Sequence, residues 1–283
     1  MEPTEGTETF QVSGRAYDTF MGRYSQRLAP VFADAARVAA GDRVLDVGCG
    51  PGALTGHLVD RLGASAVTSI DPTPPFVAAC AARFPTVDVR LARAEEIPFA
   101  DDTFDGALAQ LVLHFVRDPE RAAAEMARVV RPGGTVAACV WDFSDGMEML
   151  RHFWDAAVDV VPSAPDEARV LRFGGPGEIT DLLLGVGLDE VVETTLTVDS
   201  AYSDFDELWS GFLEGIGPAG SFCVSLSDEQ REEVRAGMFR RLGEPGGPFS
   251  LLATARCATG RTPPAPDGDA GCADAAGRED GRP

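Results

Sequence analysis

Several features are missing from this 283-residue chain. It contains no lysine, so all 24 basic residues are arginine, which points to a GC-rich bacterial coding sequence. No stretch approaches the ~18 consecutive apolar residues of a membrane-spanning helix, so we expect no transmembrane segment. The opening MEPTEGTETF has neither the basic start nor the apolar stretch of a secretory signal. We therefore expect a cytoplasmic protein.

Metal clusters and basic runs are also missing. The six cysteines are scattered, with no C-x-x-C pair and no Cys/His cluster at ligand spacing, so we expect reduced thiols and no metal site. The net charge is -21 and no basic run interrupts it. Because so acidic a chain repels phosphate backbones, we do not expect a nucleic-acid partner.

Short apolar runs alternate with helical patterns in the first half of the chain. Apolar periodicity predicts strands at 43–47, 66–71, 87–92, from 105 within 105–115, and at 135–141. It predicts intervening helices at 53–63, 74–84 and 118–134, the last with Asp118 as N-cap and a Pro-Gly-Gly stop. This alternation is typical of an α/β protein with a mostly parallel sheet covered on both faces.

The regular alternation of predicted strands and helices ends after residue 141. Helices are predicted at 147–161, 176–187, 204–216 and 227–243, and further strands at 188–198 and 248–258. A helical pattern over 17–40 is interrupted at Pro30. We expect one domain over 14–259, with disordered segments at 1–13 and, because they are rich in Pro, Gly, Ala and Asp, at 260–283.

The stretch VLDVGCGPGALT, residues 44–55, places Gly48, Gly50 and Gly52 between a strand and a helix. Closely spaced glycines let a ligand approach the backbone, and a helix start attracts anions. Asp71 ends the next strand, where a carboxylate can accept both hydroxyls of a ribose. The pair predicts an adenosine-containing ligand. The competing interpretation is a tight turn with an ordinary N-capping aspartate.

The glycine spacing alone leaves two ligand classes open, because GCGPGA fits G-x-G-x-G and also the looser G-x-G-x-x-A pattern of dinucleotide folds. Four ordered segments, VLDVGCGPG, SIDPTPPFVAAC, ARAEEIPFADDTFDGALAQLVLHF and RVVRPGGTVAACVW, extend the comparison. Together they resemble the class I S-adenosylmethionine-dependent methyltransferases, in particular the small-molecule and quinone-biosynthesis subgroup. The resemblance covers about residues 40–142, with a weaker similarity at 15–32.

This resemblance implies a three-layer Rossmann-like sandwich. Its seven-stranded sheet is mostly parallel, with an antiparallel last strand. The helices at 147–173 and 203–243 are then expected to form a cap over the carboxyl ends of the strands, where ligands of doubly wound sheets bind.

The resemblance also assigns cofactor-binding residues by position. Asp46, Gly48 and Gly50 match the loop for the methionine part, Asp71 the ribose-binding acid, and Gln110 and Leu111 the region near the sulfonium. The positions expected around the adenine are Pro72, Thr73, Ala94 and Glu95. One position departs from the family. Arg93 stands where the family has an acid, and because an arginine cannot accept the adenine amino proton, Glu95 or a backbone carbonyl would have to do so.

The segment YDTFMGRYS resembles the helix that closes over the cofactor in this subgroup. Tyr17, Arg23 and Tyr24 are predicted to hold the cofactor carboxylate, Arg23 through a charge-assisted bond. The alternative interpretation is an amphipathic helix that covers a sheet edge.

His114 follows the fourth strand at the mouth of the expected pocket. A histidine can take a proton near neutral pH, so His114 is a candidate general base, needed only if the methyl acceptor must lose a proton. The alternative is a packed residue behind the site.

The predicted function is methyl transfer from S-adenosylmethionine to a small organic acceptor through oxygen, nitrogen or carbon. Two alternatives remain at this stage: a non-catalytic protein that binds S-adenosylmethionine, and a nicotinamide-dependent oxidoreductase. The RPGG and AEEIPF segments argue against the second.

Overall fold

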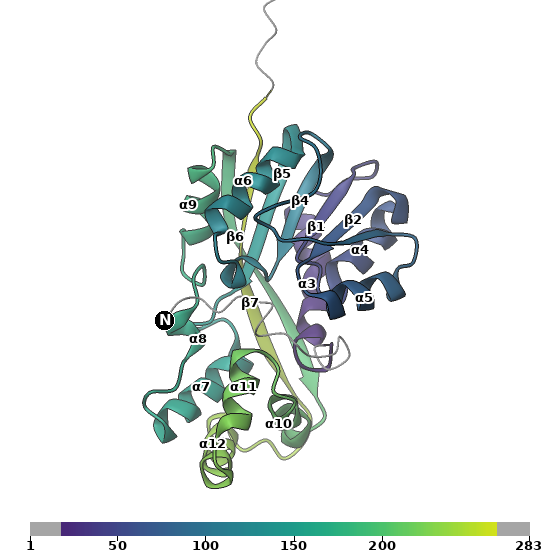
Figure 1. Cartoon of the computed structure of the whole chain (residues 1–283). Helices are drawn as coiled ribbons and strands as arrows, with labels where there is room; N and C mark the ends of the chain where they lie inside the picture. The colour runs from purple at the N-terminus through teal and green to yellow at the C-terminus, as the bar shows by residue number, and fades with distance from the viewer. Residues whose placement is uncertain (1–17, 265–283) are drawn as a thin grey trace, which may run out of the picture.

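A computed structural model of the chain describes residues 18–264, with side chains from Phe20 onward. It contains one seven-stranded sheet, in the order β3-β2-β1-β4-β5-β7-β6 (Figure 1). The strands are β1 (Val44–Val47), β2 (Val67–Asp71), β3 (Asp88–Leu91), β4 (Phe104–Gln110), β5 (Val130–Trp141), β6 (Asp189–Tyr202) and β7 (Phe249–Arg261). Strands β1 to β5 pair in parallel, and β7 runs antiparallel to both of its neighbours. The predicted sheet, including its antiparallel last strand, is confirmed.

Helices cover both faces of the sheet, because its strands are apolar on both sides. Along β5, Ala137, Cys139 and Trp141 face one apolar core and the alternate residues face the other. The first core is covered by α3 (Arg23–Ala35) and α4 (Ala53–Leu62), and the second by α6 (Pro119–Val129) and α9 (Glu178–Gly185), while α5 (Pro74–Arg83) contacts β2 and β3. A π-helical turn, η1 (Asp18–Gly22), precedes α3, and short 3-10 turns are η2 (Ala64–Ala66) and η3 (Leu113–Phe115).

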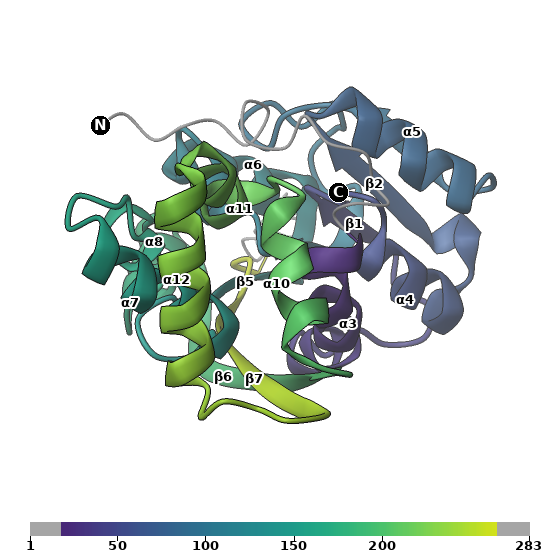
Figure 2. The same ribbon diagram turned by 90° about the horizontal axis from the view of Figure 1, so that it is seen from below.

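The remaining helices form a cap at one end of the sheet. They are α7 (Glu148–Val160), α8 (Glu167–Val170), α10 (Phe205–Leu213), α11 (Gly217–Ser225) and α12 (Asp228–Arg241). Seen from below, α7, α10, α11 and α12 form one group beside the helices of the α/β part (Figure 2). No helix within residues 18–264 is long and apolar enough to cross a membrane.

Two predicted helix boundaries are wrong. The helix expected over 118–134 ends at Val129, and the RPGG segment opens β5. A residue before proline avoids the helical region, and Gly134 lies so close to β4 that an added Cβ would sit 2.6 Å from the Asp105 carbonyl oxygen. Conversely, Pro30 lies inside α3 without ending it, because Leu28 and Phe32 around it are fully buried against the sheet.

Other boundaries also differ from those expected. The fourth strand ends at Gln110, because Leu111 turns the chain with a φ of 62°. The last strand continues through Gly260 and Arg261, which pair with Val136 and Thr135, so the domain extends past 259. The segments expected to be disordered lie otherwise largely outside the described residues.

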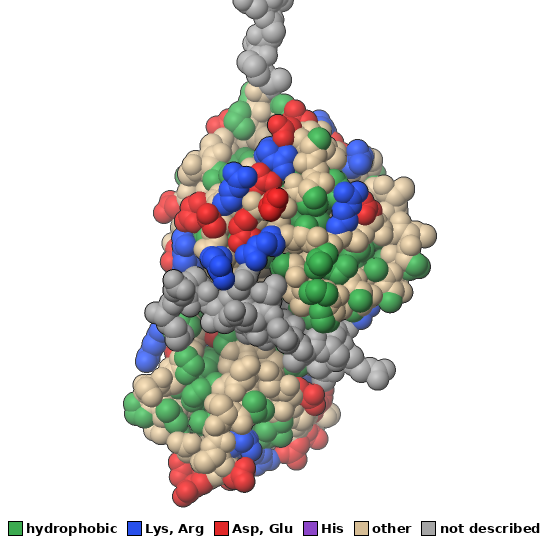
Figure 3. All heavy atoms as spheres, viewed as in Figure 1, with side chains coloured by type: hydrophobic (Ala, Val, Ile, Leu, Met, Phe, Trp, Pro, Cys, Tyr) green, Lys and Arg blue, Asp and Glu red, His purple; other side chains and the backbone are tan. Residues whose placement is uncertain are grey.

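Arginine side chains do not form an unbroken basic surface on the face drawn in Figure 3, where acidic side chains lie among them. Arg128 of α6 pairs with Asp101 at 2.7 Å and with Glu125 at 2.8 Å. Arg172 pairs with Glu120 at 2.9 Å. The exclusion of a nucleic-acid partner stays a prediction.

Candidate functional site

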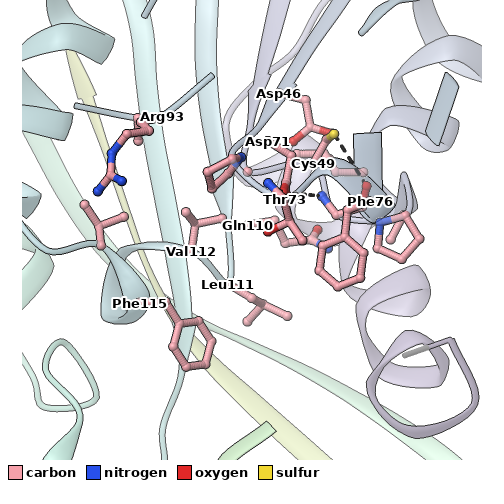
Figure 4. A pocket seen from close by; sticks show the side chains of 18 of the residues that line it. Asp46, Cys49, Asp71, Thr73, Phe76, Arg93, Gln110, Leu111, Val112 and Phe115 are labelled. Atoms are coloured by element: carbon pink, nitrogen blue, oxygen red, sulfur yellow. Dashed lines mark hydrogen bonds between the residues drawn. The ribbon is translucent and has the colours of Figure 1, made fainter. Parts of the chain in front are cut away.

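An open pocket of about 950 Å³ lies at the carboxyl ends of β1, β2 and β4. The sheet order reverses between β1 and β4, and doubly wound sheets bind ligands at such a switch point. Ten of the predicted cofactor-binding residues line this pocket: Asp46, Gly48, Gly50, Asp71, Pro72, Thr73, Ala94, Glu95, Gln110 and Leu111. Figure 4 shows Asp46, Asp71 and Thr73 close together, with Arg93 on the other side of the pocket.

Asp71 joins the glycine loop to the second strand. Its Oδ2 accepts the backbone N–H of Gly50 at 2.9 Å, and its Oδ1 accepts that of Thr73 at 2.8 Å. Burial raises the pKa of Asp71, and these two N–H groups oppose the shift. Each carboxylate oxygen has room for a second hydrogen bond, so Asp71 can still accept two hydroxyls from a ligand.

Two glycines of the loop meet different surroundings. A Cβ on Gly48 would lie 2.5 Å from the Val112 side chain, so this backbone packs directly against the end of β4. Gly50 has a φ of 52°, and an added Cβ would meet no protein atom within 4 Å. The open side of the loop is therefore at Gly50, which lines the pocket.

Asp46 lies beneath the loop and is held by hydroxyl groups. Thr55 Oγ1 donates to Asp46 Oδ2 at 2.6 Å and lies 2.9 Å from Ser69 Oγ. Burial raises the pKa of Asp46 to about 7, the Thr55 hydrogen bond opposes this, and the Asp71 charge adds to it. Asp46 is thus ionised in part at neutral pH and lies within the pocket wall.

We expect Asp46→Asn to stabilise the ligand-free protein above pH 7. The pKa of Asp46 is higher in the folded chain than in the unfolded one, so between pH 4 and 7 the folded state binds more protons than the unfolded state. The free energy of unfolding therefore falls as pH rises through this range. An asparagine accepts the Thr55 hydrogen bond without this loss, and the shift sets an upper limit of about 4 kcal/mol. Urea unfolding at pH 4, 6 and 8 measures the difference, which should vanish at pH 4.

Asp105→Asn is the control with the opposite sign. Although burial raises the pKa of Asp105, hydrogen bonds from the Arg43 backbone and the Arg131 side chain lower it overall. This variant should be less stable than wild type by a nearly constant amount between pH 6 and 8, because the stability contributed by a lowered carboxyl pKa is complete above the unfolded pKa of about 4. A difference between Asp46→Asn and wild type that does not change with pH would contradict our assignment.

The end of β4 places an amide in the pocket wall. Gln110 Nε2 donates to the Ser25 carbonyl at 3.0 Å, which ties β4 to α3. Gln110 Oε1 is buried and has no hydrogen-bond partner among the described residues. The next residue, Leu111, donates its N–H to the Cys139 carbonyl at 2.8 Å in a left-handed conformation that is rare for leucine. This conformation directs the chain toward η3, where His114 lies.

Arg93 lines the same pocket and faces a carboxylate of its own loop. Its Nη2 lies 3.5 Å from Glu95 Oε1. The departure from the family pattern therefore places an arginine–glutamate pair where an acid was expected, beside Ala94.

The structure places the predicted carboxylate-binding residues Arg23 and Tyr24 outside the pocket lining, and their role toward the cofactor stays a prediction. Arg23 donates to Glu207 Oε1 at 2.7 Å and to the Ala201 carbonyl at 3.0 Å. Tyr24 is fully buried, and its hydroxyl lies 3.0 Å from that of Tyr202. Both residues fasten α3 to β6 and the cap instead of lining the pocket. Tyr17 lies outside the described residues.

His114 lies in a second, smaller cavity beside the first. Its ring packs against Phe115 and Phe143, with centroids 4.0 Å and 5.3 Å away. Burial lowers its pKa to about 3, so the imidazole is neutral at physiological pH and is a poor proton acceptor. The expectation of a histidine base near neutral pH is therefore not met by this environment.

Sequence reasoning missed several residues that line the first pocket. They are Ser25, Cys49, Pro51, Ala53, Leu54, Phe76, Val112, Phe115, Val116 and Arg117. Phe76 had a usable signal, because it lies in the first turn of α5, three residues after Thr73, which was already assigned to the adenine. Ser25 had none, since it reaches the pocket only through the packing of α3 on β4.

Comparison with known proteins identifies sequences that are similar to this chain. Residues 45–138 match a family described as "Methyltransferase domain". An uncharacterised protein of Mycobacterium tuberculosis is 31% identical over 218 residues, which are 73% of this chain and 78% of that relative. An uncharacterised methyltransferase of the same species is 43% identical over 107 residues, or 38% of this chain and 42% of the relative.

Solved structures share the fold at low identity. Phosphoethanolamine N-methyltransferase 2 of Haemonchus contortus, in complex with phosphomonomethylethanolamine and S-adenosylhomocysteine, has a TM-score of 0.56 and 16% identity, covering 90% of this chain and 59% of that one. The [4+2]-cyclase SpnF has a TM-score of 0.55 and 19% identity, covering 91% of this chain and 86% of that one. At these identities the likeness shows the fold alone.

Proposed function

Because the chain belongs to the S-adenosylmethionine-dependent methyltransferases, we propose that it transfers a methyl group from S-adenosylmethionine to a small organic acceptor and releases S-adenosylhomocysteine. We assign it to the class I small-molecule methyltransferases. The bound cofactor supplies a methyl group on positively charged sulfur, and the protein has mainly to align donor and acceptor.

One observation carries this proposal: Asp71 and the Gly50 N–H meet in one pocket through a 2.9 Å hydrogen bond. That bond fixes the acid of the second strand against the open side of the glycine loop. The Asp71 carboxylate can accept further hydrogen bonds, as the ribose hydroxyls require. The methionine part of the cofactor needs space beside the loop, and at Gly50 an added Cβ would meet no protein atom within 4 Å. The residues present therefore fit the cofactor.

Different residues would hold the different parts of the cofactor. We assign the ribose hydroxyls to Asp71, the methionine part to the loop at Gly48 and Gly50, and the sulfonium region to Gln110 and Leu111. The adenine is assigned to Pro72, Thr73 and Phe76 for its faces, and to Ala94 and Glu95 for its edge. Glu95 then accepts the adenine amino proton in place of the acid replaced by Arg93.

Calorimetric titration with S-adenosylmethionine, S-adenosylhomocysteine and NAD tests the proposal. We expect micromolar dissociation constants for the two sulfur compounds, which share the adenosine, and no heat from NAD. Binding of NAD without the sulfur compounds would instead support an oxidoreductase. Release of S-adenosylhomocysteine on addition of acceptors separates an enzyme from a protein that only binds the cofactor.

A further inference from the structure

The second cavity lies between the end of the sheet and the cap. It spans about 410 Å³ when its opening to solvent is included, less than half of the first pocket, and Leu111 and Phe115 line both. Its wall is largely aromatic and aliphatic, with Phe20, Phe143 and residues 216–219 of the cap, and it also includes Trp141, His114 and Glu167. A molecule bound here would lie next to the sulfonium end proposed for the first pocket.

Three polar groups belong to this apolar wall. Glu167 is 3% exposed, and among the described residues its carboxylate accepts one hydrogen bond, from Trp154 Nε1 to Oε2 at 2.8 Å. Trp141 Nε1 and His114 Nδ1 are buried and have no hydrogen-bond partner within residues 18–264. A buried donor without a partner destabilises the protein, so a ligand that supplies partners here binds more tightly.

We propose that this cavity binds a compact aromatic molecule carrying a hydroxyl group, and that Glu167 accepts the proton of that hydroxyl during methyl transfer. The inference rests on the proposed function and specifies its acceptor. Glu167 would then be the catalytic base, with Trp141 orienting the hydroxyl.

The polar groups favour a hydroxyl over an amine. A hydroxyl has one proton to donate and lone pairs to accept, so it can donate to Glu167 and accept from Trp141 Nε1 together. A protonated amine could pair with Glu167 but has no lone pair for the indole N–H. The rings of Phe20, Phe115 and Phe143 favour a flat molecule, and the smaller volume limits its size to well below that of the cofactor.

The transfer step balances without a further reactant. The hydroxyl proton moves to the Glu167 carboxylate, and the hydroxyl oxygen forms a bond to the methyl carbon. The carbon–sulfur bond breaks with its electron pair left on sulfur, which becomes neutral. The products are a methyl ether, S-adenosylhomocysteine and a protonated Glu167, which returns its proton to solvent.

The environment of Glu167 suits proton transfer near neutral pH. Burial raises its pKa to about 7, the Trp154 hydrogen bond lowers it, the Asp166 charge raises it and the Arg151 charge lowers it. Arg151 itself is held by Asp166 at 2.8 Å and by Asp155 at 2.9 Å, while His114 across the cavity stays neutral. The reactive form is the carboxylate, so the rate should rise with pH and level off above about 7.

The test uses the full chain with phenol, p-cresol, catechol and 2-naphthol as acceptors, and toluene as the control without a hydroxyl. Release of S-adenosylhomocysteine is measured from pH 5.5 to 9, and binding of p-cresol and toluene to the S-adenosylhomocysteine-saturated protein is measured by calorimetry. We expect transfer to at least one phenol and at least tenfold tighter binding of p-cresol than of toluene.

Three variants separate the roles. Glu167→Gln keeps an oxygen for Trp154 and should lower the transfer rate at least 100-fold, abolish its rise with pH, and leave S-adenosylmethionine affinity unchanged. Trp141→Phe should raise KM for the phenol more than it lowers kcat. Glu148→Gln, the same exchange on α7 outside the cavity, should behave as wild type, since Glu148 accepts the Leu252 N–H at 2.6 Å and a glutamine oxygen can do so too.

Transfer to none of the four phenols, equal binding of p-cresol and toluene, or full transfer by Glu167→Gln would each overturn the inference. Failure of the underlying function has a different signature. In that case S-adenosylmethionine does not bind, or it binds and no S-adenosylhomocysteine is released with phenols, amines or carbon acceptors, whereas failure of the inference alone leaves transfer to an amine or carbon acceptor.

Discussion

Asp71→Ala is expected to weaken binding of S-adenosylmethionine and of S-adenosylhomocysteine at least 100-fold. The substitution removes both proposed ribose acceptors and leaves the N–H groups of Gly50 and Thr73 without their carboxylate. Losing charge-assisted hydrogen bonds of this kind costs about 3 kcal/mol, which corresponds to that factor. Calorimetry should show the same loss for both compounds, because the difference between them lies at the sulfur.

The matched control is Asp105→Ala. Asp105 also accepts a backbone N–H, that of Arg43 at 2.6 Å. It lies at the start of β4, whereas the pocket lies at the carboxyl ends of the strands. This variant should unfold at lower urea concentration and bind both compounds as wild type does. Equal affinity in Asp71→Ala and wild type would rule out the ribose assignment.

Gly50→Ala should lower cofactor affinity about 10- to 100-fold while the ligand-free fold loses only about 1 kcal/mol. That stability cost comes from placing a Cβ in the left-handed region, since no protein atom lies within 4 Å of the added carbon. The methyl group then occupies space in the pocket that the ligand tail needs. Titration with S-adenosylhomocysteine and urea unfolding of the same preparation measure the two effects separately.

Gly243→Ala is the control for the stability that is lost when a Cβ is placed in the left-handed backbone region. Gly243 follows α12 with a φ of 76°, and its added Cβ also meets nothing within 4 Å. Because it lies far from the pocket in the chain and does not line it, this variant should lose similar stability with unchanged affinity. If both variants bind S-adenosylhomocysteine equally well, the space at Gly50 is not part of the cofactor site.

Local sequence signals were sufficient to predict much of the lining of the first pocket but not the packing of the cap. The glycine loop and Asp71 each end a short apolar strand, so a parallel sheet brings them to one edge whatever the rest of the chain does. The contact between Tyr24 and Tyr202 joins residues 178 positions apart, and nothing near either tyrosine signals the other. Nothing in the sequence therefore predicts that polar groups of the N-terminal helix contact β6 and the cap.

The second cavity depends on the same long-range packing. Glu167 lies within the expected cap segment 147–173 but after the helix predicted at 147–161, and its burial follows from Trp154 and from the Arg151–Asp166 pair. The helix α11 was missed because GPAGSFCVS begins with helix-disfavouring Gly-Pro and has no polar face to set its period. A glutamate in a polar stretch has every local reason to be read as solvated, and only the assembled cap makes it a buried acid.

The pairing of β6 with β7 also bears on how such a chain can diversify. The β7 strand pairs with β5 only as far as Ala255, but it continues beside β6 to the Tyr202–Phe249 pair. The segment carrying α10, α11 and α12 thus enters and leaves at adjacent points of one two-stranded ribbon (Figure 1). A longer or shorter excursion between such fixed points costs little entropy. Residues 203–248 therefore form one continuous excursion from this ribbon, and because 216–219 line the second cavity, substitutions within the excursion can reshape that wall without changing the glycine loop.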